Sequence, residues 1–320
     1  MAVYTDVTDE DLELFAQRYD LGEVLSCKGI AEGVENSNFL LTTDQGNHIL
    51  TLYEKRVDPS DLPFFLGLMD HLAAKGVPSP VPVKARDGSV LQELCDRPAA
   101  IITFLLGAWP RRIEPDHCSG LGRVLAEMHL AGADFGLSRP NNLAVRDWRP
   151  LLESAGSDVD SVKPGLKAQL LSELDELESD WPDDLPTGVI HADLFPDNVF
   201  FRKGELSGVI DFYFACTDAL AYDIAICLNA WCFEPNGSFN TTKARRLLTH
   251  YTRVRPLSDA EMTALPLLAR GAAMRFLLTR LYDWLHTPAD AFVQRKDPLE
   301  YLSKLTFHKA VSGPGEYGLG

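Results

Sequence analysis

The spacing of apolar residues changes character once along this chain, close to residue 105, and that change limits the folds available to it. Before it, a capped helix from Thr8 is followed by short β-favouring runs that predict strands at 24–30, 38–43, 48–54, 81–85, 89–94 and 99–105, with one helix over 58–72 between them. Beyond Pro110, leucines at helical spacing predict helices over 118–130, 167–179, 220–233 and 265–285. This order predicts an α+β fold with a small antiparallel-sheet N-terminal lobe, residues 1–105, and a larger, mostly helical C-terminal lobe, residues 106–320.

Charge and composition argue against several classes of function. The net charge is −16, and a surface this rich in carboxylates repels phosphates, so we expect no nucleic acid and no membrane as partner. The long run 99–110 carries no charged residue, but it is far shorter than the ~20 apolar residues of a membrane span. The first residues carry no secretory or mitochondrial address, so a cytoplasmic chain is expected. The 6 cysteines form no Cys-x-x-Cys pair and are expected to be buried thiols.

A strand pattern interrupts the helical region between residues 188 and 212. Apolar runs at 199–201 and 206–210 flank Lys203-Gly-Glu205, which predicts a β-hairpin. If Gly204 and Glu205 are the two central turn residues, Asn198 lies opposite Asp211, with Cβ atoms ~5 Å apart. An amide oxygen and a carboxylate so close together suit a hard divalent cation such as Mg²⁺, which binds few protein oxygens and completes its shell with water and phosphate.

The order His191-x-Asp193-x-x-x-x-Asn198, a hairpin, and then Asp211-Phe212 resembles the catalytic segment of the protein-kinase-like superfamily. The His-x-Asp form is similar to the aminoglycoside phosphotransferase and choline kinase branch. That resemblance implies a two-lobed kinase-like fold that uses ATP and Mg²⁺. It also implies that Asp193 holds and deprotonates an acceptor hydroxyl, while Asn198 and Asp211 bind the metal on the ATP phosphates. The alternative is a structural loop in which these residues cap turns. His191 is expected to be a hydrogen-bonded core histidine.

The same resemblance assigns nucleotide contacts to the first lobe. The loop 30–38 holds one interior glycine, Gly33, and backbone N–H groups around Gly33 and Ser37 are expected to cradle phosphates. Phe104 lies in the strand whose backbone pairs with adenine, or is an ordinary buried strand residue. The position of the phosphate-anchoring lysine is Thr51, a departure that leaves Lys28, Lys55 or Arg56 to supply the charge. The facing helix offers Asp61 and Asp70 in place of a glutamate partner.

Three further residues are candidates for support or for acceptor binding. Asp223 resembles the aspartate that braces the catalytic loop in this branch, although it could equally be a helix cap. A zwitterionic acceptor needs a cation for its carboxylate and an anion for its ammonium, and for these roles we single out Arg275 and Asp218. Alternatively, Arg275 pairs with a structural acid such as Asp283 or Glu127.

Longer strings narrow the resemblance to one group. TLYEKR at 51–56, PFFLGLMDHL at 63–72, DFYFAC at 211–216, and RGAAMRFLLTRLYD at 270–283 with RKDPL at 295–299 resemble homoserine kinases of the aminoglycoside phosphotransferase type, and Thr51 is part of that pattern. The resemblance implies phosphoryl transfer from ATP to the side-chain hydroxyl of L-homoserine in threonine biosynthesis, by a monomer or homodimer. Alternatives are an aminoglycoside, choline or methylthioribose kinase, or a catalytically dead pseudokinase scaffold.

Overall fold

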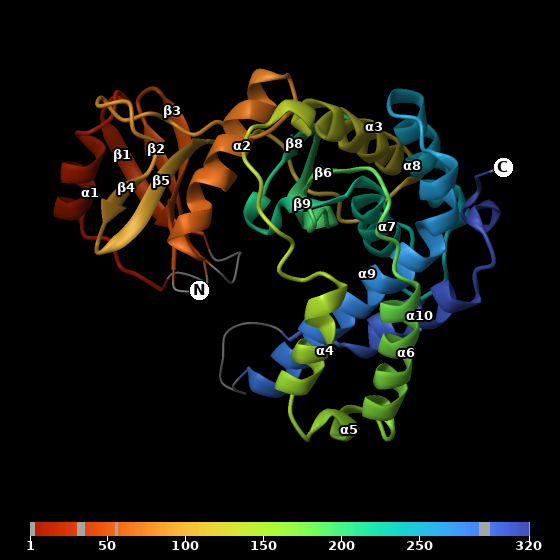
Figure 1. Cartoon of the computed structure of the whole chain (residues 1–320). Helices are drawn as coiled ribbons and strands as arrows, with labels where there is room; N and C mark the ends of the chain where they lie inside the picture. Colours follow the sequence, from red (N-terminus) through yellow and green to blue (C-terminus); the bar gives the residue numbers. More distant parts are fainter. Residues whose placement is uncertain (1–3, 31–35, 55–56, 288–294, 320) are drawn as a thin grey trace.

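A five-stranded antiparallel sheet forms the core of the N-terminal part (Figure 1). The computed structural model describes residues 4–30, 36–54, 57–287 and 295–319. The strands are β1 (Val24–Gly29), β2 (Ser37–Thr43), β3 (Gly46–Leu52), β4 (Gln92–Leu94) and β5 (Arg97–Thr103), in the spatial order β1-β2-β3-β5-β4. The predicted hairpin between β2 and β3 is confirmed, with Thr43 paired to Gly46 across a short turn.

Two helices cover opposite faces of this sheet (Figure 1). Helix α1 (Asp9–Ala16) starts where the sequence predicts, because the Thr8 side chain accepts a hydrogen bond from the Asp11 N–H at 3.2 Å. It packs on one sheet face in a small apolar cluster with Leu41 and Leu50. On the other face, helix α2 (Leu62–Ala74) packs against Ala100 and belongs to the same apolar cluster as the C-terminal helices. The face that carries α2 is therefore the face joined to the rest of the molecule.

The prediction of a strand over 81–85 is wrong. The segment makes only an isolated bridge between Pro82 and Ile102, together with hydrogen bonds from Val83 N to Ile101 O and from Thr103 N to Val81 O, both within 2.9 Å. Pro82 has no N–H to donate, so the segment can follow the sheet edge without extending its hydrogen-bond ladder. The strand predicted over 89–94 is shortened to β4, which pairs only with residues 97–99 of β5.

Helices dominate the rest of the chain and include the four that the leucine spacing predicts. They are α3 (Pro115–Ala131), α4 (Val145–Ser154), α5 (Val159–Val162), α6 (Leu166–Asp180), α7 (Leu220–Trp231), α8 (Thr241–Val254), α9 (Asp259–His286) and α10 (Leu299–Ala310), with short 3₁₀ turns η1 (Pro59–Asp61), η2 (Gly132–Asp134), η3 (Pro196–Asn198), η4 (Phe212–Phe214) and η5 (Pro314–Tyr317). The longest, α9, is buried on nearly all sides between residues 268 and 278, and apart from Arg270 and Arg275 its sequence there is apolar around the helix instead of amphipathic.

Two short antiparallel pairs stand among these helices: β6 (Thr187–Ile190) with β9 (Cys216–Ala219), and β7 (Val199–Arg202) with β8 (Glu205–Val209). The predicted β7–β8 hairpin exists, but its register differs from the prediction. Lys203 and Gly204 form the turn with φ of 53° and 85°, and Arg202 pairs with Glu205. A bulge at Ser207 then shifts the ladder, so Val199 pairs with Val209.

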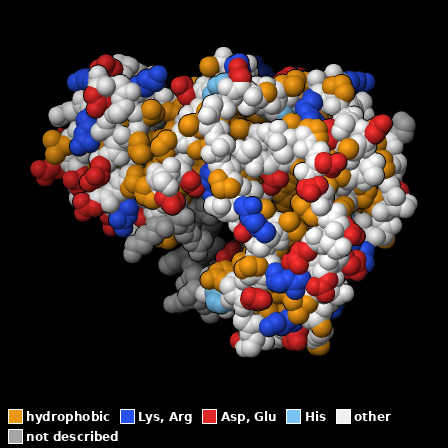
Figure 2. All heavy atoms as spheres, viewed as in Figure 1, with side chains coloured by type: hydrophobic (Ala, Val, Ile, Leu, Met, Phe, Trp, Pro, Cys, Tyr) orange, Lys and Arg blue, Asp and Glu red, His pale blue; other side chains and the backbone are white. Residues whose placement is uncertain are grey.

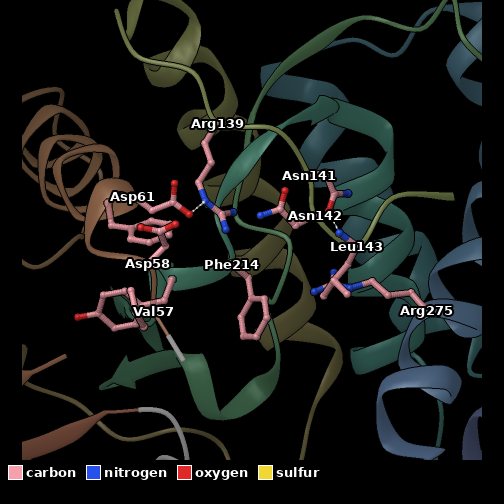
Figure 3. A pocket seen from close by; sticks show the side chains of 11 residues that line it. Val57, Asp58, Asp61, Arg139, Asn141, Asn142, Leu143, Phe214 and Arg275 are labelled. Carbon is pink, nitrogen blue, oxygen red and sulfur yellow. Dashed lines mark hydrogen bonds and ion pairs between the residues drawn. The ribbon is translucent and has the colours of Figure 1, made fainter. Parts of the chain in front are cut away.

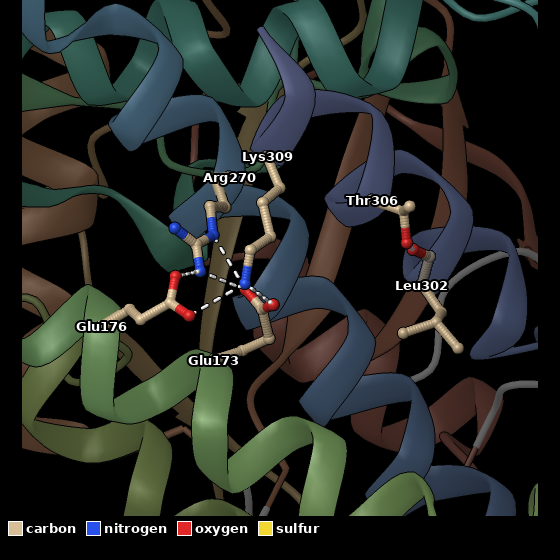
Figure 4. Close-up of polar contacts among 6 residues, drawn as sticks. All are labelled: Glu173, Glu176, Arg270, Leu302, Thr306 and Lys309. Atoms are coloured by element: carbon tan, nitrogen blue, oxygen red, sulfur yellow. Dashed lines mark hydrogen bonds and ion pairs between the residues drawn. The ribbon is translucent and has the colours of Figure 1, made fainter.

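A cluster of four charged side chains joins α6, α9 and α10 (Figure 4). The guanidinium of Arg270 binds both Glu173 and Glu176, and Lys309 Nζ lies 2.9 Å from Glu176 Oε1. Because Glu173 and Arg270 are buried, each needs the other as a partner, and the cluster fixes α9 against its neighbours.

The surface shows no single dominant sign of charge on the face in Figure 2, where basic and acidic side chains are interspersed. In the part of the chain that the structure describes, no helix is both long and apolar enough to traverse a lipid bilayer.

Candidate active site

The loop that follows β6 carries His191 and Asp193, and a buried carboxylate holds its backbone. Near the start of α7, Asp223 accepts hydrogen bonds from the N–H of His191 at 2.8 Å and from the N–H of Ala192 at 2.9 Å. Ala192 has a φ of 62°, a left-handed conformation that costs a residue with a side chain about 1–3 kcal/mol. The two hydrogen bonds to Asp223 fix this turn and thereby aim the next residue, Asp193.

Asp223 is itself held by a buried chain of polar groups. His129 Nε2 lies 3.2 Å from Asp223 Oδ2, and His129 Nδ1 lies 2.7 Å from the hydroxyl of Tyr251, which also accepts from Arg255. Burial by itself raises the pKa of Asp223, but the hydrogen bonds from the His129 ring and from the backbone N–H of His191 outweigh it and hold the pKa below its usual range. The brace therefore stays ionised at neutral pH.

His191 ties the catalytic loop to the hairpin. Its Nε2 lies 2.9 Å from the carbonyl oxygen of Ile210, and its Nδ1 accepts from the Asp193 N–H at 3.3 Å. Burial lowers the pKa of His191, so the ring is neutral, and these partners assign its proton to Nε2. The side chain thus connects the loop of Asp193 to the residue that precedes Asp211.

Asp193 is partly buried, and its environment changes its acidity. Burial raises the pKa of Asp193 to about 6, and Asp197 adds to the rise, while the positive charges of Arg275 and Lys296 oppose it. Asn198 Nδ2 donates to the Asp193 carbonyl at 2.8 Å and approaches its carboxylate at 3.3 Å. A carboxylate with such a pKa is ionised at neutral pH and is more basic than an ordinary aspartate.

The expectation that Asn198 and Asp211 lie directly opposite is wrong by one residue. The bulge moves the ladder so that the Ile210 N–H donates to the Asn198 carbonyl at 3.0 Å, and Asp211 follows as the next residue, exposed, with a φ of 66°. The two side chains come from adjacent chain segments at the open end of the hairpin. Because Asn198 uses its Nδ2 on Asp193, its Oδ1 is the atom left for a cation.

The residues predicted to contact the nucleotide differ in their burial and in their hydrogen-bond partners. Thr51 is buried on β3, and its hydroxyl donates to Asn38 Oδ1 at 2.8 Å. Ser37 is also buried, and its hydroxyl donates to Glu54 Oε1 at 2.7 Å, so its side chain is not available to a phosphate. Lys28 is exposed and, by strand register, shares a sheet face with Thr51. Gly33, Lys55 and Arg56 lie outside the described residues.

Asp61 and Asp70 are the two acids that the sequence offers in place of the glutamate partner of the missing lysine. Asp70 is exposed on α2. Asp61, at the end of η1, instead pairs with Arg139 from the segment after η2. This leaves Thr51 without an acidic partner from this helix.

Phe104 is half-buried in the segment where the chain leaves β5. Three residues later the chain crosses the β7–β8 hairpin: Gly107 has a φ of 155°, and a Cβ there would lie 2.5 Å from the Ser207 hydroxyl. Ser207 donates to the Leu106 carbonyl at 2.8 Å. The crossing fixes the connection between the two lobes.

A cavity of about 130 Å³ opens between α2, the segment after η2, and α9 (Figure 3). Arg275 lines it and is only 2% exposed; it donates to the Ala192 carbonyl and lies over the Phe276 ring with its guanidinium carbon 4.5 Å from the ring centroid. Of its two alternative partners, Glu127 pairs with Arg123 instead. Asp218 does not line the cavity.

Sequence reasoning missed Arg139 and the two asparagines Asn141 and Asn142 that also line this cavity. They lie in an extended segment without hydrophobic periodicity, so no local pattern marks them. Lys296 was part of a recognised string, but its place near Asp193 became apparent only in the folded chain.

Comparison with known proteins agrees with this geometry. The phosphotransferase enzyme family matches residues 26–257. Homoserine kinase of Rhodospirillum rubrum is 68% identical over 319 residues, covering 100% of this chain and 99% of that protein, and homoserine kinase of Paramagnetospirillum magneticum is 65% identical over 325 residues, covering 100% of both. The solved amicoumacin kinase hAmiN, in complex with AMP-PNP, Ca²⁺ and Ami, matches with a TM-score of 0.73 at 16% identity over 94% of each chain. This chain belongs to the phosphotransferase enzyme family.

Proposed function

We propose that this chain transfers the γ-phosphoryl group of ATP to the side-chain hydroxyl of L-homoserine. Its full-length relatives at 60–68% identity are homoserine kinases. The observation in the structure that carries the proposal is the position of Asp193. It follows Ala192, whose carbonyl accepts from the cavity-lining Arg275, and its own carbonyl and carboxylate are hydrogen-bonded to Asn198.

Asp193 acts as the general base. In the proposed step the acceptor oxygen bonds to the γ-phosphorus, the bond to the bridging oxygen of ADP breaks, and the hydroxyl proton passes to the Asp193 carboxylate. The rise of the pKa to about 6 increases the affinity of the carboxylate for the proton. The value still lies below neutral pH, so the carboxylate is ionised there. Asp223 and His191 act as positioning residues because they hold the loop backbone and not the reacting atoms.

Asn198 Oδ1 and the Asp211 carboxylate are the proposed Mg²⁺ ligands. Both are hard oxygen donors, and one carboxylate plus one amide is a donor set that Mg²⁺ accepts when phosphates and water complete the shell. A bound Mg²⁺ would neutralise charge on the ATP phosphates. His191 and Asn198 both bind the backbone of Ile210, which keeps Asp211 next to the catalytic loop.

Residues 1–105 form the proposed nucleotide-binding lobe, and residues 106–320 the catalytic and acceptor-binding lobe. We propose that the adenine lies at the backbone after β5, around Phe104, and that the phosphates lie near Thr51 and the backbone N–H groups of Gly33 and Ser37. The use of ATP accords with the cytoplasmic location expected from the sequence.

For the acceptor, Arg275 is the proposed carboxylate ligand, since it is a buried cation that lines the cavity and its Nε has no hydrogen-bond partner in the described residues. Asp218 has a supporting role instead of a direct one. Its Oδ2 accepts from Asn141 Nδ2 at 2.6 Å and its Oδ1 from the Ala219 N–H at 2.7 Å, so it orients an asparagine that lines the cavity.

The test is consumption of ATP in the presence of Mg²⁺ with L-homoserine, L-serine, choline, methylthioribose and kanamycin as separate acceptors. We expect turnover with L-homoserine to exceed that with the others. Turnover of another acceptor with L-homoserine inert would overturn the substrate assignment. If no ATP is consumed with any of the five acceptors, the result would favour a pseudokinase.

A further inference from the structure

The cavity beside Arg275 is built from both lobes. Asp58, Asp61 and Phe65 enter it from η1, α2 and the chain before them, whereas Arg139, Phe214 and Arg275 enter from the C-terminal part. In Figure 3, Arg139 and Arg275 approach the space around Phe214 from opposite sides. A ligand in this space would therefore contact residues of both lobes.

Arg139 holds Asp61 in position. Its Nε donates to Asp61 Oδ2 at 2.6 Å, a second nitrogen donates to the Ala215 carbonyl at 3.3 Å, and the guanidinium lies over the Phe65 ring at 5.0 Å from the ring centroid. The side chains of Arg139 and Asp61 are 14% and 26% exposed. Within the described residues, Asp61 Oδ1 accepts no hydrogen bond. The ion pair thus fixes a carboxylate at the cavity wall with one oxygen available.

Arg275 provides the opposite charge. The residue is almost completely buried, and its Nε has no hydrogen-bond partner in the described part of the chain. Burying a guanidinium with an unsatisfied N–H is costly, and a planar carboxylate is the partner that best satisfies it. A cation at one side of a small cavity and a fixed carboxylate at the other match an α-amino acid zwitterion.

We propose that Asp61 is a specificity-determining residue: its carboxylate binds the ammonium group of the acceptor while Arg275 binds the acceptor carboxylate. This inference rests on the proposed function and adds to it a contribution from the N-terminal lobe. The acceptor then bridges the two lobes, so its zwitterion is recognised only when α2 and the segment of Arg139 are docked together.

Two other carboxylates are less suited to this role. Both oxygens of Asp218 are occupied by Asn141 and by the Ala219 N–H, and Asp218 lies outside the cavity lining. Asp58 is exposed, and its Oδ1 accepts from the N–H and the hydroxyl of Ser60. A solvated ion pair contributes little to binding, so a partly buried, pre-positioned carboxylate such as Asp61 is the stronger ammonium ligand.

The experiment compares kcat/KM for three acceptors in the wild type and in Asp61→Asn. The acceptors are L-homoserine, 3-aminopropan-1-ol, which lacks the carboxylate, and 4-hydroxybutanoate, which lacks the ammonium. Loss of a hydrogen bond to a charged group lowers affinity by about 10- to 100-fold. We expect Asp61→Asn to lose about that factor with both ammonium-containing acceptors and to leave 4-hydroxybutanoate within about twofold of the wild type.

Three controls separate recognition from folding. Asp70→Asn changes an exposed carboxylate on α2, the helix that begins directly after Asp61, and should leave all three acceptors unaffected. Asp61→Glu keeps the charge and should retain the preference for ammonium-containing acceptors. Binding of Mg·ATP, measured by calorimetry, should be the same in the wild type and in Asp61→Asn, whereas a variant with a disturbed lobe would lose it.

The outcomes distinguish this inference from the proposed function. An equal loss of kcat/KM with all three acceptors, or lost Mg·ATP binding, would overturn the role of Asp61 while homoserine turnover by the wild type still stands. A wild type that does not phosphorylate L-homoserine would overturn the proposed function and this inference together.

Discussion

The acceptor side and the nucleotide side of the proposed active site differ in how many of their side chains the protein's own hydrogen bonds hold in place for the reaction. On the acceptor side, the backbone around Asp193 is held by Asp223, His191 and Asn198, all of them buried. On the nucleotide side, the Thr51 hydroxyl donates its hydrogen bond to Asn38, and the Ser37 hydroxyl donates to Glu54. The protein therefore orients the proton acceptor in advance, whereas the phosphate side must rely on backbone groups and a metal. Substitutions on the two sides should differ accordingly.

The largest effect is expected from Asp193→Asn. Removing a general base lowers kcat by about 10²- to 10⁴-fold, while calorimetric binding of Mg·ATP should remain, because Asp193 is not assigned to the nucleotide. Unreduced turnover in this variant would contradict the assigned role.

The same substitution should stabilise the fold at neutral pH. The folded pKa of Asp193, about 6, exceeds its ordinary 3.8, so the folded state binds the proton more tightly, and its contribution to stability falls as the pH rises from about 4 to 6. Asparagine avoids this cost, and with partial exposure taken into account we expect a gain of about 1–2 kcal/mol in unfolding free energy at pH 7. Denaturant unfolding at pH 7 and pH 4 measures it, and the gain should disappear at pH 4.

Asp211→Asn should raise the Mg²⁺ concentration for half-maximal turnover by about 10- to 100-fold, because an anionic ligand becomes neutral. A Mg²⁺ titration at saturating acceptor measures this. Asp197→Asn removes an exposed carboxylate next to Asn198 and is the matched control, whose Mg²⁺ requirement should stay close to that of the wild type. Equal shifts in both variants would argue for general electrostatics instead of ligation.

Asp223→Asn tests the brace of the catalytic loop. One backbone N–H then faces an amide N–H₂ group, which costs about 1–3 kcal/mol of stability and displaces Asp193. We expect kcat to fall by about 10-fold or more, with KM for ATP changed much less. Unfolding and steady-state kinetics measure both effects, with exposed Asp180→Asn as the control. A loss of stability without a change in kcat would separate Asp223 from catalysis.

The pH profile sharpens the comparison on the acceptor side. With the pKa of Asp193 near 6, kcat should fall about tenfold per pH unit below that value, because the protonated carboxyl cannot accept a proton. Lys296→Met removes a positive charge that lowers this pKa and should move the acid limb to higher pH. Asp197→Asn removes a negative charge that raises it and should move the limb to lower pH. Shifts in the same direction would exclude Asp193 as the titrating group.

The smallest effect is expected on the nucleotide side. Thr51→Val removes the hydrogen bond to Asn38 and should cost about 1 kcal/mol of stability. KM for ATP should change by less than about twofold, because the hydroxyl is turned to its neighbouring strand. A large rise in KM would mean that Thr51 contacts the phosphates, and the contrast between the two sides would fail.

Some of the fold followed from local pattern, and the errors have local causes as well. The Thr8 cap and the leucine-spaced helices were predictable because they depend on residues within a few positions of one another. The hairpin register was not, because it depends on which two residues adopt positive φ at the turn and on a bulge at Ser207. The prediction of a strand at 81–85 was wrong because strand propensity does not show whether a neighbouring strand can form a continuous hydrogen-bond ladder with the segment.

The amino-acid sequence by itself determined the two kinds of lobe, the order of Asp193, Asn198 and Asp211, and the family to which they point, since motifs and periodicity are written in neighbouring residues. Only the tertiary structure decided that Arg139 reaches Asp61, that Asp218 supports an asparagine, and that Arg275 lines a cavity while its Nε has no hydrogen-bond partner among the described residues. The first two contacts join residues 78 and 77 positions apart, and all three features depend on how α2, α9 and the segment between them pack. No local rule specifies that packing.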